Sequence, residues 1–231
     1  MHPDNVYVVI VAAGTGSRFG SDVPKQFLPM GAECIPVLMH TIMAFRRAGI
    51  KDENMCIVLG PSAIEYWEEL CKNKDFISPK VTAGGETRFH SVRNAMETIP
   101  GSREGRVLVH DGVRPLVSMK VIESVIEALD SSDCAVPVVP ATNSLRHVCD
   151  DGGNESVNRA EYFEVQTPQG FRADVIKEAY KAPFSSKFTD DASVAESAGH
   201  SITMVAGDMN NIKVTTPKDL LLAEILLARG E

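Results

Sequence analysis

Several features that mark other classes of protein are missing from this sequence of 231 residues. Its five cysteines form no CxxC pair and are odd in number, which argues against a disulfide framework or a zinc site and fits reduced core thiols. No apolar run approaches the roughly 20 residues that cross a bilayer, and the first residues, MHPDN, lack the basic and apolar segments of a signal sequence. We therefore expect a soluble, cytoplasmic protein with no membrane partner.

An excess of positive charge is also missing, since the formal net charge is −8. A protein with this balance has no broad electrostatic footprint for nucleic acid or for an anionic membrane surface. Any anionic ligand must therefore be bound by a local group of basic residues. The composition, 44% hydrophobic and 23% charged, is typical of a globular chain. We expect residues 1–231 to form one domain with a single appended arm.

The apolar pattern predicts an α/β fold. Short runs rich in β-branched residues are typical of strands buried on both faces, and they occupy residues 6–12, 55–60, 106–110 and 134–139. Apolar residues at three-and-four spacing indicate amphipathic helices between them: Phe89, Val92, Ala95, Met96 and Ile99, and Val121, Ile122, Val125, Ile126 and Leu129. This alternation predicts a Rossmann-like, mostly parallel sheet with helices on both faces, and a ligand crevice beyond the carboxyl ends of the strands.

The last helix is delimited by residues that favour helix ends. Thr216 is suited to the N-cap and Pro217 to the first helical position. Gly230 follows the last periodic residue, where glycine is common just beyond a helix. The segment TTPKDLLLAEILLARG therefore predicts a C-terminal helix.

Residues 141–165 interrupt the alternation of strands and helices. They read ATNSLRHVCDDGGNESVNRAEYFEV, two short polar strands about the turn DDGG, with little apolar area of their own. A lone hairpin is only marginally stable in water. We predict that this arm packs on a partner subunit and makes the protein a homodimer. The alternative is a hairpin folded back over its own domain.

The first strand leads into a glycine-rich loop, VYVVIVAAGTGSRFGSDVPKQFLPM at residues 6–30. The loop is not a phosphate-binding P-loop, because GxxxxGK followed by Ser or Thr occurs nowhere in the chain. It also departs from the dinucleotide fingerprint, since Gly14, Gly16 and Gly20 have one residue too many between them and the second strand ends in Gly-Pro. A nicotinamide-dependent oxidoreductase is therefore a weak interpretation.

What remains is a glycine loop with two cations. Gly14 and Gly16 lack side chains, so backbone N–H groups can approach phosphate oxygens closely. Arg18 offers a planar fork for two oxygens, and Lys25 supplies a compact charge. These residue types favour a triphosphate ligand, although an ordinary strand-to-helix turn with solvated cations would satisfy the same short pattern.

The longer string AAGTGSRFGSDVPKQFLPM resembles the signature of sugar nucleotidyltransferases. Five further segments are similar to 2-C-methyl-D-erythritol 4-phosphate cytidylyltransferases: GGETRFHSVRNAM at 84–96, HDGVRPLVS at 110–118, VNRAEYFEVQTPQGF at 157–171, FTDDASVAE at 188–196 and NIKVTTPKDL at 211–220. The motifs cover nearly the whole chain and are specific in combination. The resemblance implies the nucleotidyltransferase fold and an enzyme of the non-mevalonate isoprenoid pathway. It would join CTP to methylerythritol phosphate, use Mg²⁺, release pyrophosphate and work as a homodimer with interlocked arms.

The resemblance also implies roles in binding CTP. Arg18 and Lys25 would hold the triphosphate, and Lys213 would stabilise the charge that develops at the α-phosphate. Asp111, directly after the apolar run RVLVH, would meet ribose or the metal ion. The remaining positions that match the nucleotide site are Ala13, Gly14, Gly16, Gly85, Ser91 and Gly112. The alternatives are a solvated lysine for Lys213, a surface hydroxyl for Ser91 and a turn cap for Asp111.

The pocket for the acceptor is implied to draw on Arg114, Ser144, Arg159, Thr167 and Thr189, with Ser144 reaching across the dimer. Arg159 suits a phosphate because a guanidinium can bind two oxygens together. The alternatives are a solvated hairpin arginine and, for Thr189, a helix N-cap. We interpret His110 as a packed strand residue, because an ionised phosphate nucleophile needs no general base.

Two departures from the family pattern concern the acceptor. Asn143-Ser144 stands where Asp-Thr is expected, and HDGVRP where HDAARP is usual.

A ribitol-5-phosphate cytidylyltransferase would have similar opening and QTPQ motifs, but it tends to carry Ala-Gly-Gly in the first loop and lacks the VNR string. A nucleotide-binding regulator without catalysis is a further alternative. The presence of Arg18, Lys25, Asp111 and Lys213 argues against it.

Overall fold

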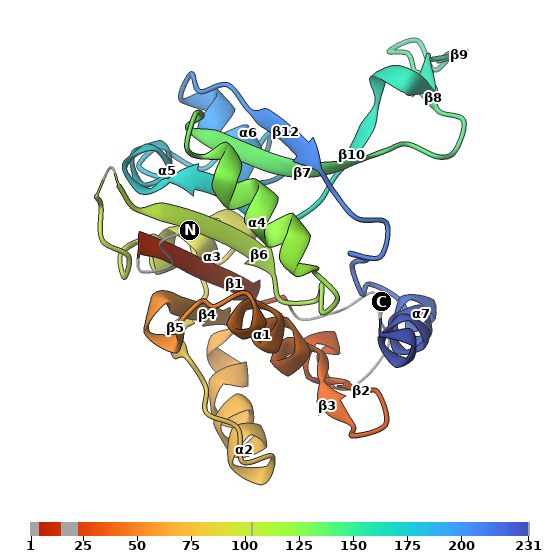
Figure 1. Cartoon of the computed structure of the whole chain (residues 1–231). Coiled ribbons are helices and arrows are strands. Elements are labelled where there is room, and N and C mark those ends of the chain that lie inside the picture. Colours follow the sequence, from red (N-terminus) through yellow and green to blue (C-terminus); the bar gives the residue numbers. More distant parts are fainter. Residues whose placement is uncertain (1–4, 15–22, 103, 231) are drawn as a thin grey trace.

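An eight-stranded, mostly parallel sheet forms the centre of the fold (Figure 1). The computed structural model describes residues 5–14, 23–102 and 104–230 of the chain. Its strands are β1 (Val6–Ala12), β4 (Met55–Leu59), β5 (Lys80–Ala83), β6 (Arg106–Asp111), β7 (Cys134–Pro140), β10 (Phe163–Val165), β11 (Gln169–Arg172) and β12 (Thr203–Ala206). Two small sheets pair β2 (Pro29–Met30) with β3 (Ile35–Pro36) and β8 (Arg146–Val148) with β9 (Asn154–Ser156). The helices are α1 (Val37–Arg47), α2 (Ile64–Asn73), α3 (Arg88–Met96), α4 (Met119–Ala128), α5 (Ala173–Ala179), α6 (Asp191–Ser197) and α7 (Pro217–Arg229).

The strand order confirms the predicted fold class. Along the sheet the order is β10-β7-β11-β6-β1-β4-β5, and β12 also pairs with β7. The pairs β1–β4, β1–β6, β4–β5 and β7–β12 are parallel, whereas β10 and β11 run antiparallel to their neighbours. Parallel pairs require crossover connections, and the helices between the strands provide them.

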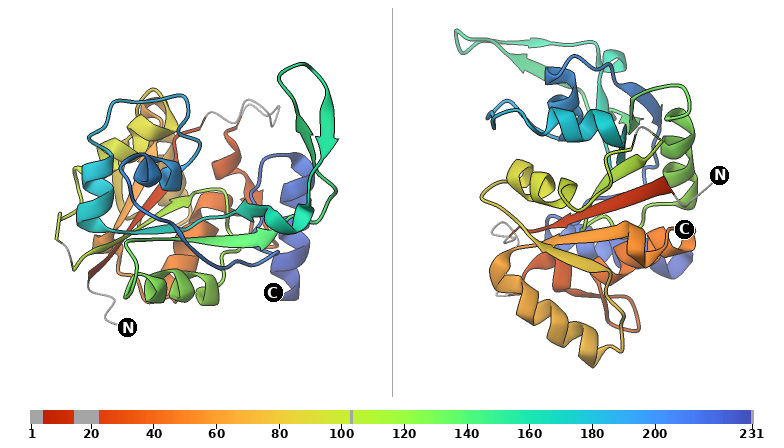
Figure 2. Two further views of the ribbon diagram at one scale, coloured as in Figure 1. Left: turned by 90° about the horizontal axis from the view of Figure 1, so that it is seen from above. Right: turned by 90° about the vertical axis from the view of Figure 1, so that its left-hand side faces the viewer.

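Strand β1 shows why the sheet strands are continuous apolar runs. Val8 and Ile10 pack on one face, in a core that includes residues of α1, α2 and α4. Val9 packs on the opposite face, among residues of α3, α5 and α6. Because helices cover both faces of the sheet (Figure 2), a polar residue in β1 would be buried on either side. The four strands predicted from the sequence are confirmed as β1, β4, β6 and β7, within one residue at each end.

The predicted helix ends are confirmed most fully at α7. Thr216 Oγ1 accepts a hydrogen bond from the Asp219 N–H, and the Asp219 carboxylate accepts one from the Thr216 N–H at 2.7 Å. This reciprocal arrangement is a capping box. Gly230 ends the helix with φ +72°, a left-handed conformation that glycine adopts readily.

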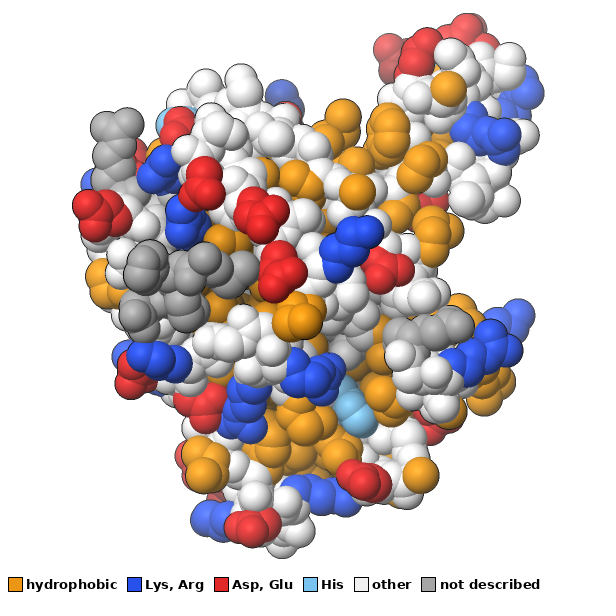
Figure 3. All heavy atoms as spheres, in the orientation of Figure 1, with side chains coloured by type: hydrophobic (Ala, Val, Ile, Leu, Met, Phe, Trp, Pro, Cys, Tyr) orange, Lys and Arg blue, Asp and Glu red, His pale blue; other side chains and the backbone are white. Residues whose placement is uncertain are grey.

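Strands β8 and β9 form the predicted hairpin arm. They pair antiparallel, with Arg146 opposite Ser156 and Val148 opposite Asn154. Figures 1 and 2 show the hairpin projecting away from the sheet, and Figure 3 shows it standing clear of the body in the space-filling view. The alternative of a hairpin folded back over its own domain is therefore wrong. The predicted range of 141–165 is too long, because residues 163–165 form β10 and pair with β7 in the central sheet.

The cysteines are only partly the core thiols that the sequence predicted. Cys56, Cys71 and Cys134 are buried, but Cys34 is exposed and Cys149 is half-buried, and all five are free thiols. The prediction is therefore wrong for the last two. None of the helices in the described part of the chain is both long and apolar enough to cross a membrane.

Candidate active site

A cavity of about 350 Å³ opens at the carboxyl ends of β1 and β6. This is the edge of the sheet at which the alternation of strands and helices predicted a ligand crevice. The cavity is lined by Val11, Ala12, Ala13, Gly14, Lys25, Gln26, Gly85, Glu86, Thr87, Arg88, Ser91, Asp111, Val113 and Lys213. Three of these side chains are cationic and two are anionic, so the cavity is basic within a chain whose net charge is −8. It therefore contains the local basic group that an anionic ligand requires.

Gln26 anchors the start of the glycine loop. Its side chain is almost fully buried, and Nε2 donates hydrogen bonds to the carbonyl oxygens of Ala12 at 2.9 Å and Gly14 at 3.0 Å. The backbone that leaves β1 is thereby tied to the short 3-10 helix η2 (Lys25–Phe27), which also places Lys25 at the cavity wall. Sequence reasoning missed Gln26. The feature that could have indicated it is a polar amide side chain next to Lys25 in an otherwise apolar stretch.

Two of the residues predicted for this loop, Gly16 and Arg18, lie outside the described residues. Their roles stay predictions that rest on the sequence. Ala13 and Gly14 are described and line the cavity.

The opposite wall brings the backbone at Gly84 and Gly85 close to the loop. A Cβ on Gly84 would lie 2.7 Å from the Ala13 Cβ, and one on Gly85 would lie 2.5 Å from the His90 Cβ. Both positions therefore require glycine. The buried Ser91 hydroxyl accepts a hydrogen bond from the Gly85 N–H at 3.1 Å and donates one to the Thr87 carbonyl oxygen at 2.9 Å. Ser91 is thus an internal brace of the wall rather than a surface hydroxyl.

Asp111 lies at the end of β6 among three cations. Its carboxylate is 2.9 Å from Lys213 Nζ, 3.5 Å from Arg114 Nε and 3.6 Å from Arg88 Nε. Burial alone would raise the pKa of Asp111, but Arg88, Lys213 and Arg114 outweigh it and hold that pKa well below its ordinary range. Asp111 is therefore ionised at any physiological pH. The adjacent Gly112 cannot carry a side chain, because a Cβ there would lie 2.8 Å from the Ala12 Cβ.

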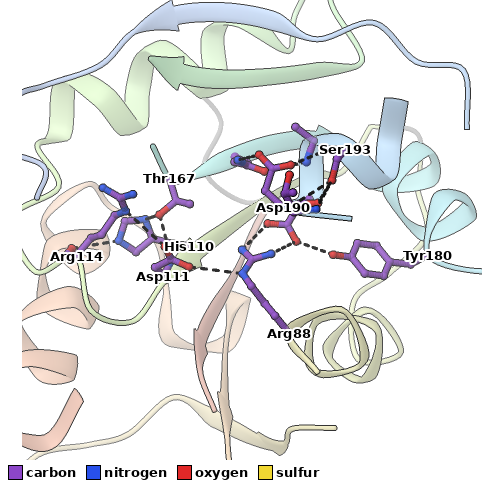
Figure 4. A network of polar contacts seen from close by, with 12 residues as sticks. Arg88, His110, Asp111, Arg114, Thr167, Tyr180, Asp190 and Ser193 are labelled. Carbon is purple, nitrogen blue, oxygen red and sulfur yellow. Dashed lines mark hydrogen bonds and ion pairs between the residues drawn. The ribbon is translucent and has the colours of Figure 1, made fainter. Parts of the chain in front are cut away.

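Arg88 lines the cavity and also binds the buried carboxylate of Asp191. Figure 4 shows Arg88 between Asp111 and Tyr180. Its guanidinium donates two hydrogen bonds to the Asp191 carboxylate, at 2.9 and 2.6 Å, and Tyr180 Oη donates a third at 2.6 Å. Burial opposes the charge on Arg88, but Asp191 and Asp111 outweigh it and raise the pKa of Arg88. Arg88 is thus fixed between two carboxylates, one at the cavity and one in the core. Sequence reasoning assigned no role to Arg88, Asp191 or Tyr180.

Arg114 and Thr167, both predicted to contact the acceptor, are engaged within the protein. Arg114 donates to the Asn211 carbonyl oxygen at 2.7 Å, in addition to its contact with Asp111. The buried Thr167 hydroxyl accepts a hydrogen bond from the Asp111 N–H at 3.1 Å and contacts His110 Nδ1 at 3.1 Å (Figure 4). Neither side chain lines the cavity. In this structure both residues hold Asp111 in place.

His110 is fully buried beneath Asp111. Its ring nitrogens contact Thr167 Oγ1 and the Arg114 carbonyl oxygen, and the ring packs edge-on against Phe45. Burial lowers the pKa of His110 from 6.5 to about 4. The imidazole is therefore neutral at pH 7, as expected of the packed strand residue that the sequence predicted.

This buried imidazole predicts a loss of stability in mild acid. The unfolded chain takes up a proton near pH 6.5, whereas the folded chain takes it up only near pH 4, so stability falls as the pH drops through that window. The shift corresponds to about 3 kcal/mol, at about 1.4 kcal/mol per pKa unit. Urea unfolding at pH 7 and pH 4.5 should show a smaller acid-induced loss for His110→Asn than for the parent. Equal losses in the two proteins would contradict this role of His110.

The other three positions predicted for the acceptor lie outside the cavity. Ser144 and Arg159 are exposed at the base of the arm, and Arg159 donates a hydrogen bond to the Thr142 carbonyl oxygen at 2.7 Å. Thr189 is exposed, and its backbone N–H donates to Ser193 Oγ at 3.0 Å. The N-cap of α6 is Asp190, so the alternative reading of Thr189 as the cap is wrong. Within one chain the structure does not bring Ser144 or Arg159 to the cavity.

The residues at the cavity fit Mg²⁺ only in partnership with a phosphate ligand. Mg²⁺ is usually bound through one or two carboxylates together with waters and substrate phosphates. Asp111 supplies an ionised carboxylate, and Glu86 is a second acid on the cavity wall. The three cations around Asp111 disfavour a metal held by protein alone. They are compatible with a metal whose charge is balanced by a polyphosphate.

Comparison with known proteins decides the family. Residues 6–229 match the family model described as 2-C-methyl-D-erythritol 4-phosphate cytidylyltransferase. The chain belongs to this family. A cytidylyltransferase of that name from Phocaeicola vulgatus is 46% identical over 224 residues, which cover 96% of this chain and all of the relative. One from Porphyromonas gingivalis is 44% identical over 223 residues, covering 96% of this chain and 97% of the relative.

Solved cytidylyltransferase structures share the fold. The enzyme from Thermus thermophilus is 33% identical, with a TM-score of 0.76 over 97% of this chain and 99% of that one. The enzyme from Francisella tularensis is 29% identical, with a TM-score of 0.79 over 96% of this chain and 99% of that one. These likenesses extend along nearly the whole chain.

Proposed function

We propose that this chain transfers the cytidylyl group of CTP to 2-C-methyl-D-erythritol 4-phosphate, forming 4-CDP-2-C-methyl-D-erythritol and pyrophosphate in non-mevalonate isoprenoid biosynthesis. The family match over residues 6–229 carries this proposal. The basic cavity supports it, because the glycine loop, Lys25 and Lys213 meet there around the ionised Asp111. As an enzyme, the chain is a nucleotidyltransferase.

The reaction needs alignment and charge stabilisation rather than proton transfer. A phosphate oxygen of the acceptor attacks the α-phosphorus of CTP, and the bond from that phosphorus to the bridging oxygen of pyrophosphate breaks. The attacking oxygen is already ionised at neutral pH, so no general base is required. His110, beneath Asp111, is buried and neutral and does not line the cavity.

The cations of the cavity provide the charge stabilisation. Lys25 holds the triphosphate against the backbone of Gly14, both of which line the cavity. Arg18 and Gly16, outside the described residues, are assigned to the same triphosphate on the sequence alone. Lys213, held 2.9 Å from Asp111, faces the α-phosphate, where negative charge increases in the transition state. Mg²⁺, when bound with the nucleotide at Asp111, would neutralise further phosphate charge.

Recognition of cytosine uses the rigid backbone of the cavity wall. Gly85 presents its peptide group at a position where no larger residue fits. Ala13 presents its peptide group between Ala12 and Gly14, whose carbonyl oxygens both accept hydrogen bonds from Gln26. Ser91 contributes by bracing Gly85, since its hydroxyl hydrogen is already donated to the Thr87 carbonyl. Asp111, which lines the cavity, meets the ribose, and the adjacent Gly112 lets the backbone pack closely against Ala12.

The acceptor site is completed by a second subunit. Ser144 and Arg159 lie on the projecting arm, and apolar side chains exposed near them favour burial against a partner: Val148, Tyr162, Phe163 and Val165. We therefore propose a homodimer in which the arm of one subunit reaches the cavity of the other, next to Thr189. Light scattering at micromolar concentration should give the molar mass of two chains. A mass of one chain would overturn the dimer.

A cytoplasmic location is part of the same proposal. The five cysteines are free thiols, including the exposed Cys34, which is compatible with a reducing compartment. Neither nucleic acid nor a membrane surface is expected as a partner, given the net charge of −8.

The decisive experiment measures pyrophosphate release with CTP and Mg²⁺, using 2-C-methyl-D-erythritol 4-phosphate and ribitol 5-phosphate as separate acceptors. Release with the first alone supports the proposal. Release with ribitol phosphate alone would keep the CTP site but overturn the roles of Arg159 and Thr189. Binding of CTP without release of pyrophosphate in the presence of either acceptor would favour a non-catalytic regulator.

Gln26 should affect the use of CTP through the glycine loop. Gln26→Met keeps the size of the side chain but removes two hydrogen bonds to the loop, each worth about 0.5–1.5 kcal/mol. We expect the KM for CTP to rise about tenfold, which corresponds to about 1.4 kcal/mol. Steady-state kinetics at saturating acceptor would measure this, and the KM for the acceptor serves as the internal control. An unchanged KM for CTP would contradict the anchoring role.

A further inference from the structure

A group of metal-ligating side chains lies on the arm, away from the cavity. It consists of His147 in β8, Cys149 just beyond β8 and Glu155 in β9. A ring nitrogen, the sulfur and a carboxylate oxygen of these residues all lie within 4.8 Å of one another. Cys149 is half-buried, and the other two are exposed.

The hairpin geometry places the three side chains on one face. His147 lies opposite Glu155 in the antiparallel register, so their side chains emerge on the same side of the ribbon. Cys149 follows His147 by two residues, and the alternation along a strand returns it to that side. Val148, between them, belongs to the other face.

The turn fixes the position of the cysteine. The Cys149 N–H donates a hydrogen bond to the Gly153 carbonyl oxygen at 2.9 Å, and the Gly152 N–H donates one to the Cys149 carbonyl oxygen at 3.0 Å. Gly152 has φ +82°, the left-handed conformation that a three-residue hairpin loop requires. Asp151 Oδ1 accepts from the Gly153 N–H at 2.8 Å and closes the loop further. The backbone of Cys149 is therefore held by hydrogen bonds on both sides.

We propose that His147, Cys149 and Glu155 bind one Zn²⁺, with water as the fourth ligand. Zinc takes thiolate, imidazole and carboxylate ligands at about 2.0–2.3 Å, so two ligand atoms on a tetrahedral ion lie about 3.4–3.7 Å apart. Closing the observed separation of up to 4.8 Å needs only small side-chain rotations, and His147 and Glu155 are exposed and free to make them. A thiolate and an imidazole disfavour Mg²⁺ and Ca²⁺, which separates this site from the metal expected at Asp111.

The ion would connect the two strands of the arm. The arm is a two-stranded hairpin with three residues in each strand and all six of them exposed, and such a hairpin is marginal by itself. A metal held by β8 and β9 together fixes their register at the end next to the turn. The sequence spacing does not show the site, because the carboxylate ligand comes from the other strand. This inference is independent of cytidylyl transfer.

The test is direct binding of Zn²⁺ to the full-length protein. Protein stripped with a chelator and dialysed should bind one Zn²⁺ per chain by calorimetry. Cys149→Ser and His147→Ala should each weaken binding by roughly 100-fold or more, because losing even an outer partner of a metal ligand costs about 10–100-fold. Cys34→Ser is the matched control, since it removes a free thiol elsewhere on the surface and should bind as the parent does.

A spectroscopic measurement distinguishes a thiolate ligand from a folding defect. Co²⁺ added to the stripped parent should produce a thiolate-to-metal charge-transfer absorption that Cys149→Ser lacks and Glu155→Gln weakens. Circular dichroism of each variant should match that of the parent. Equal Zn²⁺ affinity in the parent and Cys149→Ser overturns the site, and so does a loss of binding in Cys34→Ser. Pyrophosphate release by the zinc-free parent is measured in parallel and reports on the proposed function separately.

Discussion

Lys213→Ala should lower turnover with CTP and methylerythritol phosphate about 10²–10³-fold, by analogy with the loss of one group that stabilises transition-state charge. The reason lies in its position. Lys213 Nζ is 2.9 Å from Asp111 at the mouth of the cavity, while its side chain stays 40% exposed and accessible to a ligand. A lysine there can follow negative charge as it builds up at the α-phosphate. The rate constant kcat at saturating substrates measures the effect.

Lys25→Ala should produce a loss of the same order, because Lys25 lines the same cavity. Lys218→Ala is the matched control: Lys218 is exposed on the first turn of α7 and lies outside the cavity. The control should keep its turnover within a factor of about two, since surface substitutions away from such features usually change little. Turnover within threefold of the parent for Lys25→Ala or Lys213→Ala would remove that lysine from the mechanism.

The stability of the lysine variants distinguishes chemistry from folding. Asp111 keeps Arg88 and Arg114 as neighbours when Lys213 is removed, at 3.6 and 3.5 Å. We therefore expect the urea midpoint of Lys213→Ala to stay close to that of the parent. A large fall in the midpoint together with low activity would indicate a structural role instead.

Arg88→Met should destabilise the fold by about 3–5 kcal/mol, the cost of leaving a buried charge without its partner. Asp191 is 0% exposed and loses both hydrogen bonds from the guanidinium, while the one from Tyr180 remains. Asp111 loses one of its three cations at the same time. Urea unfolding monitored by circular dichroism gives the free energy of unfolding directly.

The double variant Arg88→Met/Asp191→Asn tests that explanation. Removing the carboxylate charge should restore a large part of the lost stability, because an amide at that position carries no uncompensated charge and still accepts from Tyr180 Oη. Lys181→Met is the control: its pair with Glu178 is exposed on both sides, and such pairs contribute at most about 1 kcal/mol. If the double variant were no more stable than Arg88→Met, the buried charge would not be the cause.

The predictions that were confirmed concern features encoded in neighbouring residues. Strands β1, β4, β6 and β7 could be found because burial on both faces demands an uninterrupted apolar run. The ends of α7 could be found because Thr216 and Gly230 act on the backbone beside them. Strand β5 was missed because it lies at the sheet edge and is only partly buried. Strand β10 was assigned to the arm because its pairing with β7 depends on residues far along the chain.

The sequence by itself determined the α/β class, the hairpin arm and the family, since each depends on residue types at short and fixed spacing. The tertiary structure alone decided which distant side chains are in contact. Arg88 and Asp191 are 103 residues apart, and Gln166 and Asn211 are 45 apart, yet each pair is in contact. It also showed that Thr167 and Arg114 are engaged in holding Asp111, and that three possible ligands share one face of the arm. The physical reason is common to these cases: sheet order and strand register bring distant segments together, and local sequence patterns carry no record of either.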